Sequence, residues 1–223
     1  MRILIVVSHT DDEVLGLGGT IAKHKNDGDE IYAISMTNGT DARSQNDLKI
    51  IEQRNVSSNK ASQILGFDWI KSCKFPDNAM DSVPLIEIVK QIEEAKTLVS
   101  PEIIYTHSSS DLNIDHRIVC KATLTAFRPQ PKEFWKEIRA FEVPSATDYG
   151  HSSVTGSFNP NFFNNISETI TLKIEGLKAY SQEMREYPHS RSFEGVINLA
   201  KYRGNQVGLE YAEAFEILRK IKR

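Results

Sequence analysis

Short apolar runs alternate with longer amphipathic stretches along the first two-thirds of the chain. The apolar runs predict strands over Ile3–Val7, Glu30–Met36, Asp68–Ser72 and Glu102–Thr106. The stretches between and after them predict helices over about Glu13–Lys25, Gln45–Leu65, Pro84–Val99 and His116–Phe127. Alternating strands and helices are typical of βαβ units, whose strands run parallel. We therefore expect a Rossmann-like α/β fold, with a mostly parallel sheet flanked by helices, in a single domain over residues 1–223.

The pattern weakens beyond Pro129. Weaker strand candidates lie at Lys136–Glu142 and Ser167–Thr171, and helix candidates lie at Leu172–Glu183 and Glu194–Lys201. The stretch Tyr211–Leu218 fits either a strand or a helix. The order of elements in the last third of the chain is therefore open.

Residues that can bind a metal follow two of the predicted strands directly. His9, Asp11, Asp12 and Glu13 come after the first strand, and a second group, His107–His116, comes after the fourth. Imidazole and carboxylate suit Zn²⁺ and its first-row neighbours, and a catalytic zinc site needs only three protein ligands. Ligands of open parallel sheets bind beyond the carboxyl ends of the strands, so the two groups can meet in one crevice. This pattern predicts a metal site.

Both groups resemble motifs of the PIG-L/LmbE-like family of metal-dependent N-deacetylases. His9-Thr10-Asp11-Asp12-Glu13 resembles the family's His-Pro-Asp-Asp-Glu signature, and Asn113-Ile114-Asp115-His116-Arg117 resembles its His-Pro-Asp-His-Arg signature. Weaker similar segments follow in the family's order: Arg54 with Ala61, Leu65 and Gly66; Tyr180-Ser181-Gln182; and Arg203-Gly204 with Tyr211-Ala212-Glu213-Ala214-Phe215. The resemblance spans nearly the whole chain and favours a strand over Tyr211–Leu218. It implies hydrolysis of the acetamide of an N-acetylated sugar or sugar conjugate to amine and acetate.

The resemblance also implies roles for five residues of the two motifs. His9, Asp12 and His116 would hold Zn²⁺, or another divalent ion such as Fe²⁺, and a water would complete the shell. Asp11 would be the general base for this water, whose pKa zinc lowers to about 7. Asp115 would hydrogen bond to a ligand or a catalytic partner, or would serve only as the N-cap of the following helix.

One position departs from the family pattern in a way that affects the chemistry. Asn113 stands where the family has a His that is thought to stabilise the oxyanion or to protonate the leaving amine. Asn can donate a hydrogen bond to an oxyanion, but it cannot deliver a proton. The proton would then come from Asp11, His107 or His189.

Four side chains outside the ligand set are candidates for substrate binding: Arg54, His107, His189 and Arg191. His189 and Arg191 share one loop and could contact a sugar hydroxyl or a phosphate. Ser57 stands where a Glu often follows the helix Arg in the family, so a partner for Arg54 must come from elsewhere. Long polar connections at 37–45, 107–115 and 143–165 are expected to shape the acceptor pocket.

Composition narrows the class of protein. The 223 residues carry 27 Lys and Arg against 30 Asp and Glu, a formal charge of -3, with no strongly basic block. Phosphate neutralisation drives nucleic acid binding, so we expect no nucleic acid partner. Two cysteines are too few for a disulfide framework, the first strand leaves no room for a signal peptide, and the apolar runs are too short for a membrane span. We expect a cytoplasmic protein; because the family often assembles, a homo-oligomer is an open alternative.

Two other classes of protein compete with a deacetylase. Gly16-Leu17-Gly18-Gly19 after the first strand suggests a dinucleotide oxidoreductase. That fingerprint needs Gly at its sixth position, where Ile21 stands, and the acidic cluster would repel a pyrophosphate. A catalytically inactive, metal-containing glycan-binding protein stays open because of Asn113, as does a hydrolase of another amide.

Overall fold

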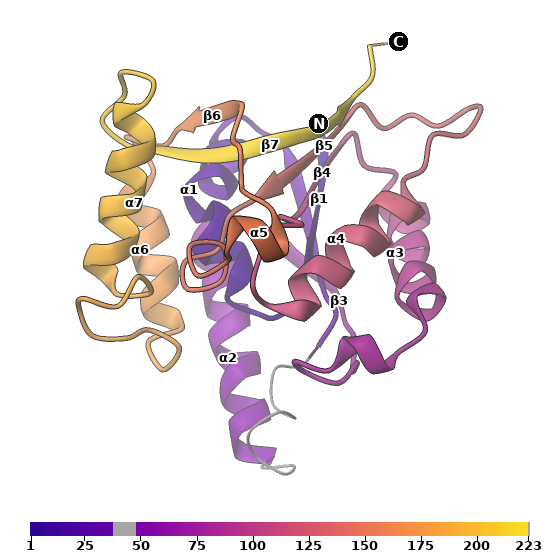
Figure 1. The fold of residues 1–223 in the computed structure, drawn as a ribbon, viewed down its shortest axis with the longest axis horizontal. Coiled ribbons are helices and arrows are strands. Elements are labelled where there is room, and N and C mark those ends of the chain that lie inside the picture. Colours follow the sequence, from indigo (N-terminus) through magenta and orange to yellow (C-terminus); the bar gives the residue numbers. More distant parts are fainter. Residues whose placement is uncertain (38–47, 223) are drawn as a thin grey trace.

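The computed structural model describes residues 1–37 and 48–222 and shows a seven-stranded sheet with helices on both faces (Figure 1). The strands are β1 (Arg2–Val7), β2 (Glu30–Ser35), β3 (Asp68–Ser72), β4 (Ile103–His107), β5 (Glu137–Phe141), β6 (Phe162–Asn165) and β7 (Ala212–Lys220). Their order across the sheet is β3-β2-β1-β4-β5-β7-β6. The first five strands are parallel, and β7 is antiparallel to both of its neighbours. The predicted α/β fold with a mostly parallel sheet is confirmed.

The helices cover the sheet because its central strands are apolar on both sides. The helices are α1 (Asp12–Asn26), α2 (Leu48–Leu65), α3 (Leu85–Val99), α4 (Ile114–Ala126), α5 (Ser152–Thr155), α6 (Ile170–Ala179) and α7 (Phe193–Asn205), with one 3-10 turn, η1 (Met80–Ser82). In β1, Ile3 and Ile5 pack in a core with α1, α2 and α6, whereas Leu4 and Val6 pack in a second core with α3 and α4. The period of two along the strand divides its side chains between the two cores.

The carboxyl ends of β1 and β4 lie beside each other at the point where the strand order reverses. From β1 the chain builds β2 and β3 on one side, and it then crosses to β4 and β5 on the other. The pairing of Ile5 with Tyr105 sets the register of the two strands. Just beyond it, the Ser8 amide donates a hydrogen bond of 2.8 Å to His107 Nε2. Ligand crevices of open α/β sheets form at such switch points.

α1 is broken in its middle, where the sequence has its cluster of glycines. Leu17 has φ -144° and ψ 23°, outside the helical region, so the helix consists of two segments joined by a kink. A side chain at Gly16 would meet the Phe141 ring, since a Cβ there would lie 2.3 Å from Cδ2. The Glu213 carboxylate accepts hydrogen bonds from the amides of Gly19 and Thr20, at 2.9 and 2.7 Å, and so caps the second segment. Gly16 therefore leaves room for the Phe141 ring at the helix break, and Gly19 provides an amide for the Glu213 carboxylate.

The carboxylate at this break belongs to a buried ion pair. Lys173 Nζ donates to Glu213 Oε1 at 2.5 Å and to the Leu15 carbonyl at 2.8 Å, which lies just before the kink. Lys173 is 3% exposed and Glu213 is 4% exposed. The pair therefore satisfies backbone groups on both sides of the break and ties α6 and β7 to α1.

The predictions made for the chain beyond Pro129 are correct in part. The predicted strands at Lys136–Glu142 and Tyr211–Leu218 are confirmed as β5 and β7. The prediction of a strand at Ser167–Thr171 is wrong, because the chain turns there and enters α6. β6 lies just before it and was missed, since it has only four residues, two of which are Asn. The start of the predicted helix Gln45–Leu65 falls outside the described residues.

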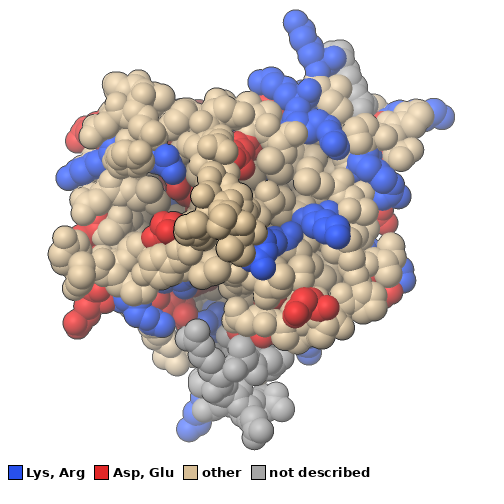
Figure 2. Space-filling view, in the orientation of Figure 1, with Lys and Arg blue, Asp and Glu red and all other residues tan. Residues whose placement is uncertain are grey.

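Both signs of charge are spread over the face drawn in Figure 2. A group of basic side chains near its centre lies over α4, which carries Arg117 and Lys121. Acidic side chains lie at several places around this group. Among the described residues, no helix combines the length and the apolar character that a membrane crossing requires.

We expect Glu213→Ala to lower the free energy of unfolding by about 3–5 kcal/mol, because it leaves Lys173 buried without its partner carboxylate and uncaps the second segment of α1. Urea unfolding followed by circular dichroism measures the change. Glu210→Ala, at an exposed position before the same strand, is the matched control and should change the free energy by less than about 0.5 kcal/mol. A loss below about 1 kcal/mol in Glu213→Ala would show that the buried pair does not hold the kinked helix.

Candidate metal centre and active site

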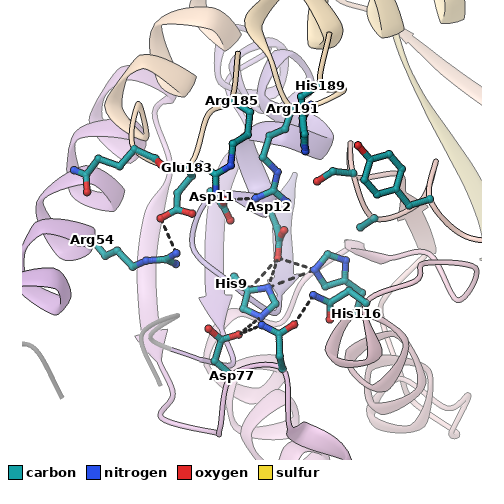
Figure 3. A pocket seen from close by; sticks show the side chains of 16 residues that line it. His9, Asp11, Asp12, Arg54, Asp77, His116, Glu183, Arg185, His189 and Arg191 are labelled. Carbon is teal, nitrogen blue, oxygen red and sulfur yellow. Dashed lines mark hydrogen bonds and ion pairs between the residues drawn. The ribbon is translucent and has the colours of Figure 1, made fainter. Parts of the chain in front are cut away.

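The side chains that follow β1 and β4 surround a cavity of about 600 Å³ at the switch point of the sheet (Figure 3). His9, Asp11 and Asp12 come from the turn between β1 and α1, and His116 comes from the first turn of α4. The loop after β3 adds Asp77 from below in the view of Figure 3. The predicted convergence of the two strand-end groups is therefore what the structure shows.

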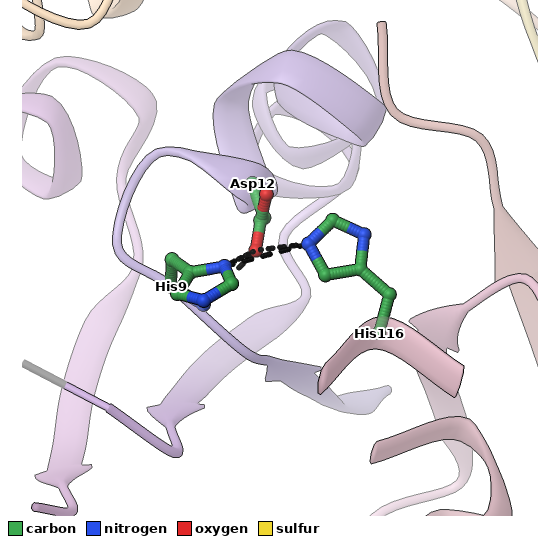
Figure 4. Close-up of side chains that lie close together, drawn as sticks. All are labelled: His9, Asp12 and His116. Carbon is green, nitrogen blue, oxygen red and sulfur yellow. Dashed lines mark hydrogen bonds and ion pairs between the residues drawn. The ribbon is translucent and has the colours of Figure 1, made fainter. Parts of the chain in front are cut away.

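Three donor atoms at the bottom of this cavity have the spacing of a tetrahedral metal site (Figure 4). His9 Nδ1 lies 3.2 Å from Asp12 Oδ2, and His116 Nε2 lies 3.4 Å from each of these two atoms. Ligands about 2.0–2.1 Å from a tetrahedral ion stand about 3.3–3.4 Å apart. The spacing of the donor atoms of His9, Asp12 and His116 therefore fits Zn²⁺ or a related divalent ion. We call these three residues the metal triad.

Each imidazole of the metal triad has a carboxylate on its other nitrogen. His9 Nε2 lies 2.9 Å from Asp77 Oδ1 and 3.3 Å from Asp115 Oδ2, and His116 Nδ1 lies 2.7 Å from Asp111 Oδ2. Such carboxylates fix the ring orientation and the tautomer of ligating histidines. Burial raises the pKa of Asp12, but the neighbouring His116 and the hydrogen bonds from His116 and His9 outweigh it and hold that pKa well below its usual value. Asp12 is therefore a carboxylate, as a ligand must be.

Asp115 lies behind His9, and it does not cap α4. Its carboxylate is fully buried and accepts hydrogen bonds from the amides of Asn78, at 2.7 Å, and Met80, at 3.0 Å. The N-cap of α4 is Asn113, whose Oδ1 accepts from the Asp115 amide at 2.9 Å. The alternative of a pure N-cap at Asp115 is wrong by two residues. Asp115 fixes the loop that carries Asp77, and its contact with His9 Nε2 agrees with the expected hydrogen bond to a member of the metal triad.

Asp11 adopts a backbone conformation that side chains rarely take, with φ 137° and ψ -27°. It is 3% exposed, and Arg191 Nη1 donates to its Oδ2 at 3.2 Å. Burial, opposed by the Arg191 charge, raises the pKa of Asp11 to about 6. The side chain lines the cavity next to Asp12, so two consecutive carboxylates face the same space.

Glu13 does not join the metal triad. It is fully buried, and its carboxylate accepts from the Asp11 amide at 3.0 Å and from the Tyr180 hydroxyl at 2.7 Å. Burial raises the pKa of Glu13 to about 8. Its contacts are therefore with the backbone and with a phenol, outside the cavity.

The expectation that His107 binds substrate is wrong. This side chain is fully buried, and its ring is stacked on His116, with centroids 3.9 Å apart, and lies at a tilt against Phe141, with centroids 4.8 Å apart. Burial holds the pKa of His107 well below its usual value, so the ring is neutral, and its Nε2 accepts from the Ser8 amide. His107 supports the His116 ring from behind and does not line the cavity.

The part of the chain that contains this site is similar to a known protein family. Residues 4–127, which contain the whole metal triad, match the PIG-L family, described as GlcNAc-PI de-N-acetylase. The chain belongs to the PIG-L family. The expectation of a hydrolase acting on an amide bond is thereby confirmed. That one PIG-L domain extends over residues 1–223 stays a prediction.

Three known proteins are similar to this chain over most of its length. The uncharacterized deacetylase YaiS of Escherichia coli K12 is 27% identical over 184 residues, covering 80% of this chain and 89% of YaiS. A probable N-acetyl-alpha-D-glucosaminyl L-malate deacetylase 2 of Bacillus cereus is 25% identical over 200 residues, covering 85% of this chain and 88% of that protein. The crystal structure of the conserved protein TT1542 from Thermus thermophilus is 25% identical, with a TM-score of 0.77 and coverage of 99% and 96% of the two chains.

The cavity of this PIG-L protein has a second wall, formed by α2 and the segment 182–191 (Figure 3). It brings together Arg54, His189 and Arg191, three of the four side chains expected to bind substrate. Arg54 Nη2 donates to Glu183 Oε1 at 2.7 Å, which supplies the partner that Ser57 cannot. Glu183 was not anticipated, because it lies 129 residues further along the chain.

Other lining residues could not be assigned from the sequence. Asp77 follows the end of β3, and its place after a parallel strand was the signal that could have found it. Tyr149 comes from the long connection 143–165, as expected for a pocket loop, and its ring lies against His189 with centroids 6.0 Å apart. Arg185 comes from the segment 182–191, in which the sequence pointed to His189 and Arg191 but not to Arg185. Most of the loop 37–45, also expected to shape the pocket, falls outside the described residues.

We expect Asp111→Asn to weaken zinc binding about 10–100-fold, because the amide orients the His116 ring less firmly than the carboxylate does. Competition with a fluorescent zinc chelator measures the affinity. Asp81→Asn, at an exposed carboxylate in η1, is the matched control and should leave the affinity unchanged. An unchanged affinity in Asp111→Asn, together with full zinc binding in His116→Ala, would show that the metal triad is not the zinc site.

Proposed function

We propose that this protein is a zinc-dependent N-deacetylase that hydrolyses the acetamide of an N-acetylated sugar or sugar conjugate to the amine and acetate. The observation that supports this most is the metal triad, with donor atoms 3.2–3.4 Å apart, beside the buried carboxylate of Asp11 in one cavity. A bound divalent ion supplies Lewis acidity, which polarises a carbonyl oxygen and acidifies a water. A His-His-Asp set does not choose sharply among divalent ions, so Fe²⁺ is the alternative to Zn²⁺.

Asp11 takes the proton of the attacking water. It lines the cavity next to the ligand Asp12, and Arg191 holds one of its oxygens, Oδ2. In the part of the chain that the structure describes, Oδ1 of Asp11 has no hydrogen bond from the protein, which leaves this oxygen for the water. A carboxylate with its pKa raised by burial can accept a proton near neutral pH and can release it again.

Asn113 contributes a hydrogen bond and no proton. Its Oδ1 caps α4, and its Nδ2 donates to Asn78 Oδ1 at 3.1 Å. The amide nitrogen carries two hydrogens, so one remains for the oxyanion of the tetrahedral intermediate. Because His107 is buried behind the metal triad, Asp11 or His189 returns the proton to the leaving amine, and we assign this step to Asp11.

The second wall of the cavity, together with the ring of Tyr149 at the rim, suits a sugar. Arg54, His189 and Arg191 offer hydrogen-bond donors, and Tyr149 offers an aromatic ring at the rim, where it is half exposed. Sugar rings present both hydroxyls and apolar faces, which such a wall can bind. The relative from Bacillus cereus is described as acting on an N-acetylglucosaminyl conjugate, which agrees with this substrate class.

We expect zinc-reloaded protein to release acetate from at least one member of a panel of N-acetyl sugars and sugar conjugates. His116→Ala should abolish the release through loss of the metal. Asp11→Asn should lower kcat about 10²–10⁴-fold while the zinc content stays the same, because Asn cannot accept the proton. An acetate assay and elemental analysis of the same samples make the measurement.

His151→Ala, at an exposed histidine away from the metal triad, is the control and should behave as the parent protein does. Tight zinc and ligand binding with no release from any member of the panel would contradict the proposal. That result would favour an inactive glycan-binding protein or a hydrolase of another amide.

A further inference from the structure

The two consecutive aspartates after β1 face one cavity at a helix start whose backbone is unusual. An N-cap residue normally has an extended backbone, and its side chain folds back onto the first turn of the helix. Asp11 occupies the N-cap position of α1, but its φ of 137° lies in a region favoured by glycine. Its side chain makes no capping hydrogen bond and instead lines the cavity beside Asp12. Something in the structure must hold the backbone in this conformation.

The contacts that hold it come from Glu13 and Tyr180. Glu13 Oε2 accepts from the Asp11 amide at 3.0 Å, and Glu13 Oε1 accepts from the Tyr180 hydroxyl at 2.7 Å. Glu13 is fully buried, and Tyr180 is 2% exposed. Tyr180 directly follows α6, whose packing against α1 fixes the position of the hydroxyl. The phenol thus anchors the Glu13 carboxyl group, and that group anchors the amide of Asp11.

We propose that Glu13 and Tyr180 are positioning residues that hold Asp11 in its unfavourable backbone conformation, and so keep its carboxylate beside the metal triad. This inference rests on the proposed role of Asp11 as the base. Neither residue touches the metal triad or lines the cavity, so both act through Asp11. The Arg191 contact to Asp11 Oδ2 fixes the other end of the same residue. Tyr180 therefore holds the backbone of Asp11 through Glu13, and Arg191 holds its side chain. Both residues belong to the segment 180–191.

The kinetic test compares three variants with zinc bound. Glu13→Leu removes the acceptor for the Asp11 amide, and we expect kcat to fall about a hundredfold with KM within about threefold. Tyr180→Phe should cost about tenfold in kcat, because Glu13 loses its anchor but keeps its contact with Asp11. Glu13→Gln keeps an oxygen acceptor and should restore most of the turnover lost in Glu13→Leu. Glu168→Leu and Tyr202→Phe, at exposed positions, are the matched controls.

Zinc affinity and KM separate positioning from other roles. A weakened zinc affinity in Glu13→Leu would assign the residue to the metal triad, and a raised KM at unchanged kcat would assign it to substrate binding. A loss of kcat in Glu13→Gln as large as in Glu13→Leu would show that a hydrogen-bond acceptor is not what matters. Each of these results would overturn the proposal.

A stability measurement tests the same inference without turnover. Asp11→Gly and Asp11→Ala both remove the carboxylate, but only Gly adopts the observed φ without strain. We expect Asp11→Gly to melt about 2–8 °C above Asp11→Ala. In the Glu13→Leu background this difference should shrink by at least half, because the backbone is free to relax. An unchanged difference would overturn the proposal even if no substrate is found, whereas a failed acetate assay alone would contradict only the proposed function.

Discussion

Three consecutive carboxyl groups, those of Asp11, Asp12 and Glu13, are buried at the carboxyl end of β1, and the site depends on how each is compensated. None is more than 3% exposed. Buried like charges cannot all persist without separate partners. Asp12 faces imidazoles, Asp11 faces the guanidinium of Arg191, and Glu13 receives a phenol and a backbone amide. Three chemically different partners thus give one acidic run the separate environments that the proposed ligand, base and anchor need.

The fold supplies those partners from segments that are distant along the chain. The β1–β4 pairing brings α4 and its His116 to Asp12, and the segment after α6 brings Tyr180 and Arg191 to Glu13 and Asp11. The break in α1 is held by distant segments as well, and the first of its two segments begins at the cavity. Glu213 and Lys173 stabilise that break from β7 and α6. The antiparallel β7 therefore helps to hold α1, the helix that begins at the candidate metal site.

The parts of the site that could be predicted from the sequence are those governed by local pattern. The two strand-end groups were predicted because residues that can bind a metal follow apolar strands directly and parallel strands end at one edge, whereas the choice of His9, Asp12 and His116 within them came from the resemblance to the PIG-L family. The partners of Arg54 and Asp11 were not found, since Glu183 and Arg191 lie 129 and 180 residues away along the chain. Such pairs depend on how α6 and the segment after it pack, and no periodicity in the sequence encodes that. The error at His107 has the same origin, because only the packed structure shows its ring behind His116.

The same distinction applies to β6 and to the start of α4. β6 is held by pairing with β7 and carries little apolar pattern of its own, so a local signal for it is lacking. At α4 both Asn113 and Asp115 are residues that favour an N-cap. Tertiary contacts decide between them, because two amides of the loop at 78–80 donate to the Asp115 carboxylate. A buried carboxylate with two amide donors leaves Asn113 to cap the helix.

The use of Asn113 as a cap changes the proton path in the proposed mechanism. This residue begins the helix that carries His116 three positions later, so its amide fixes a ligand and has no proton to give. Acid and base duties then fall on a single carboxylate, which must accept a proton from water and return it to nitrogen. A group that serves both steps works best with a pKa close to the operating pH. Burial moves the pKa of Asp11 in that direction, to about 6, so the environment that compensates the acidic run also fits it for the double role.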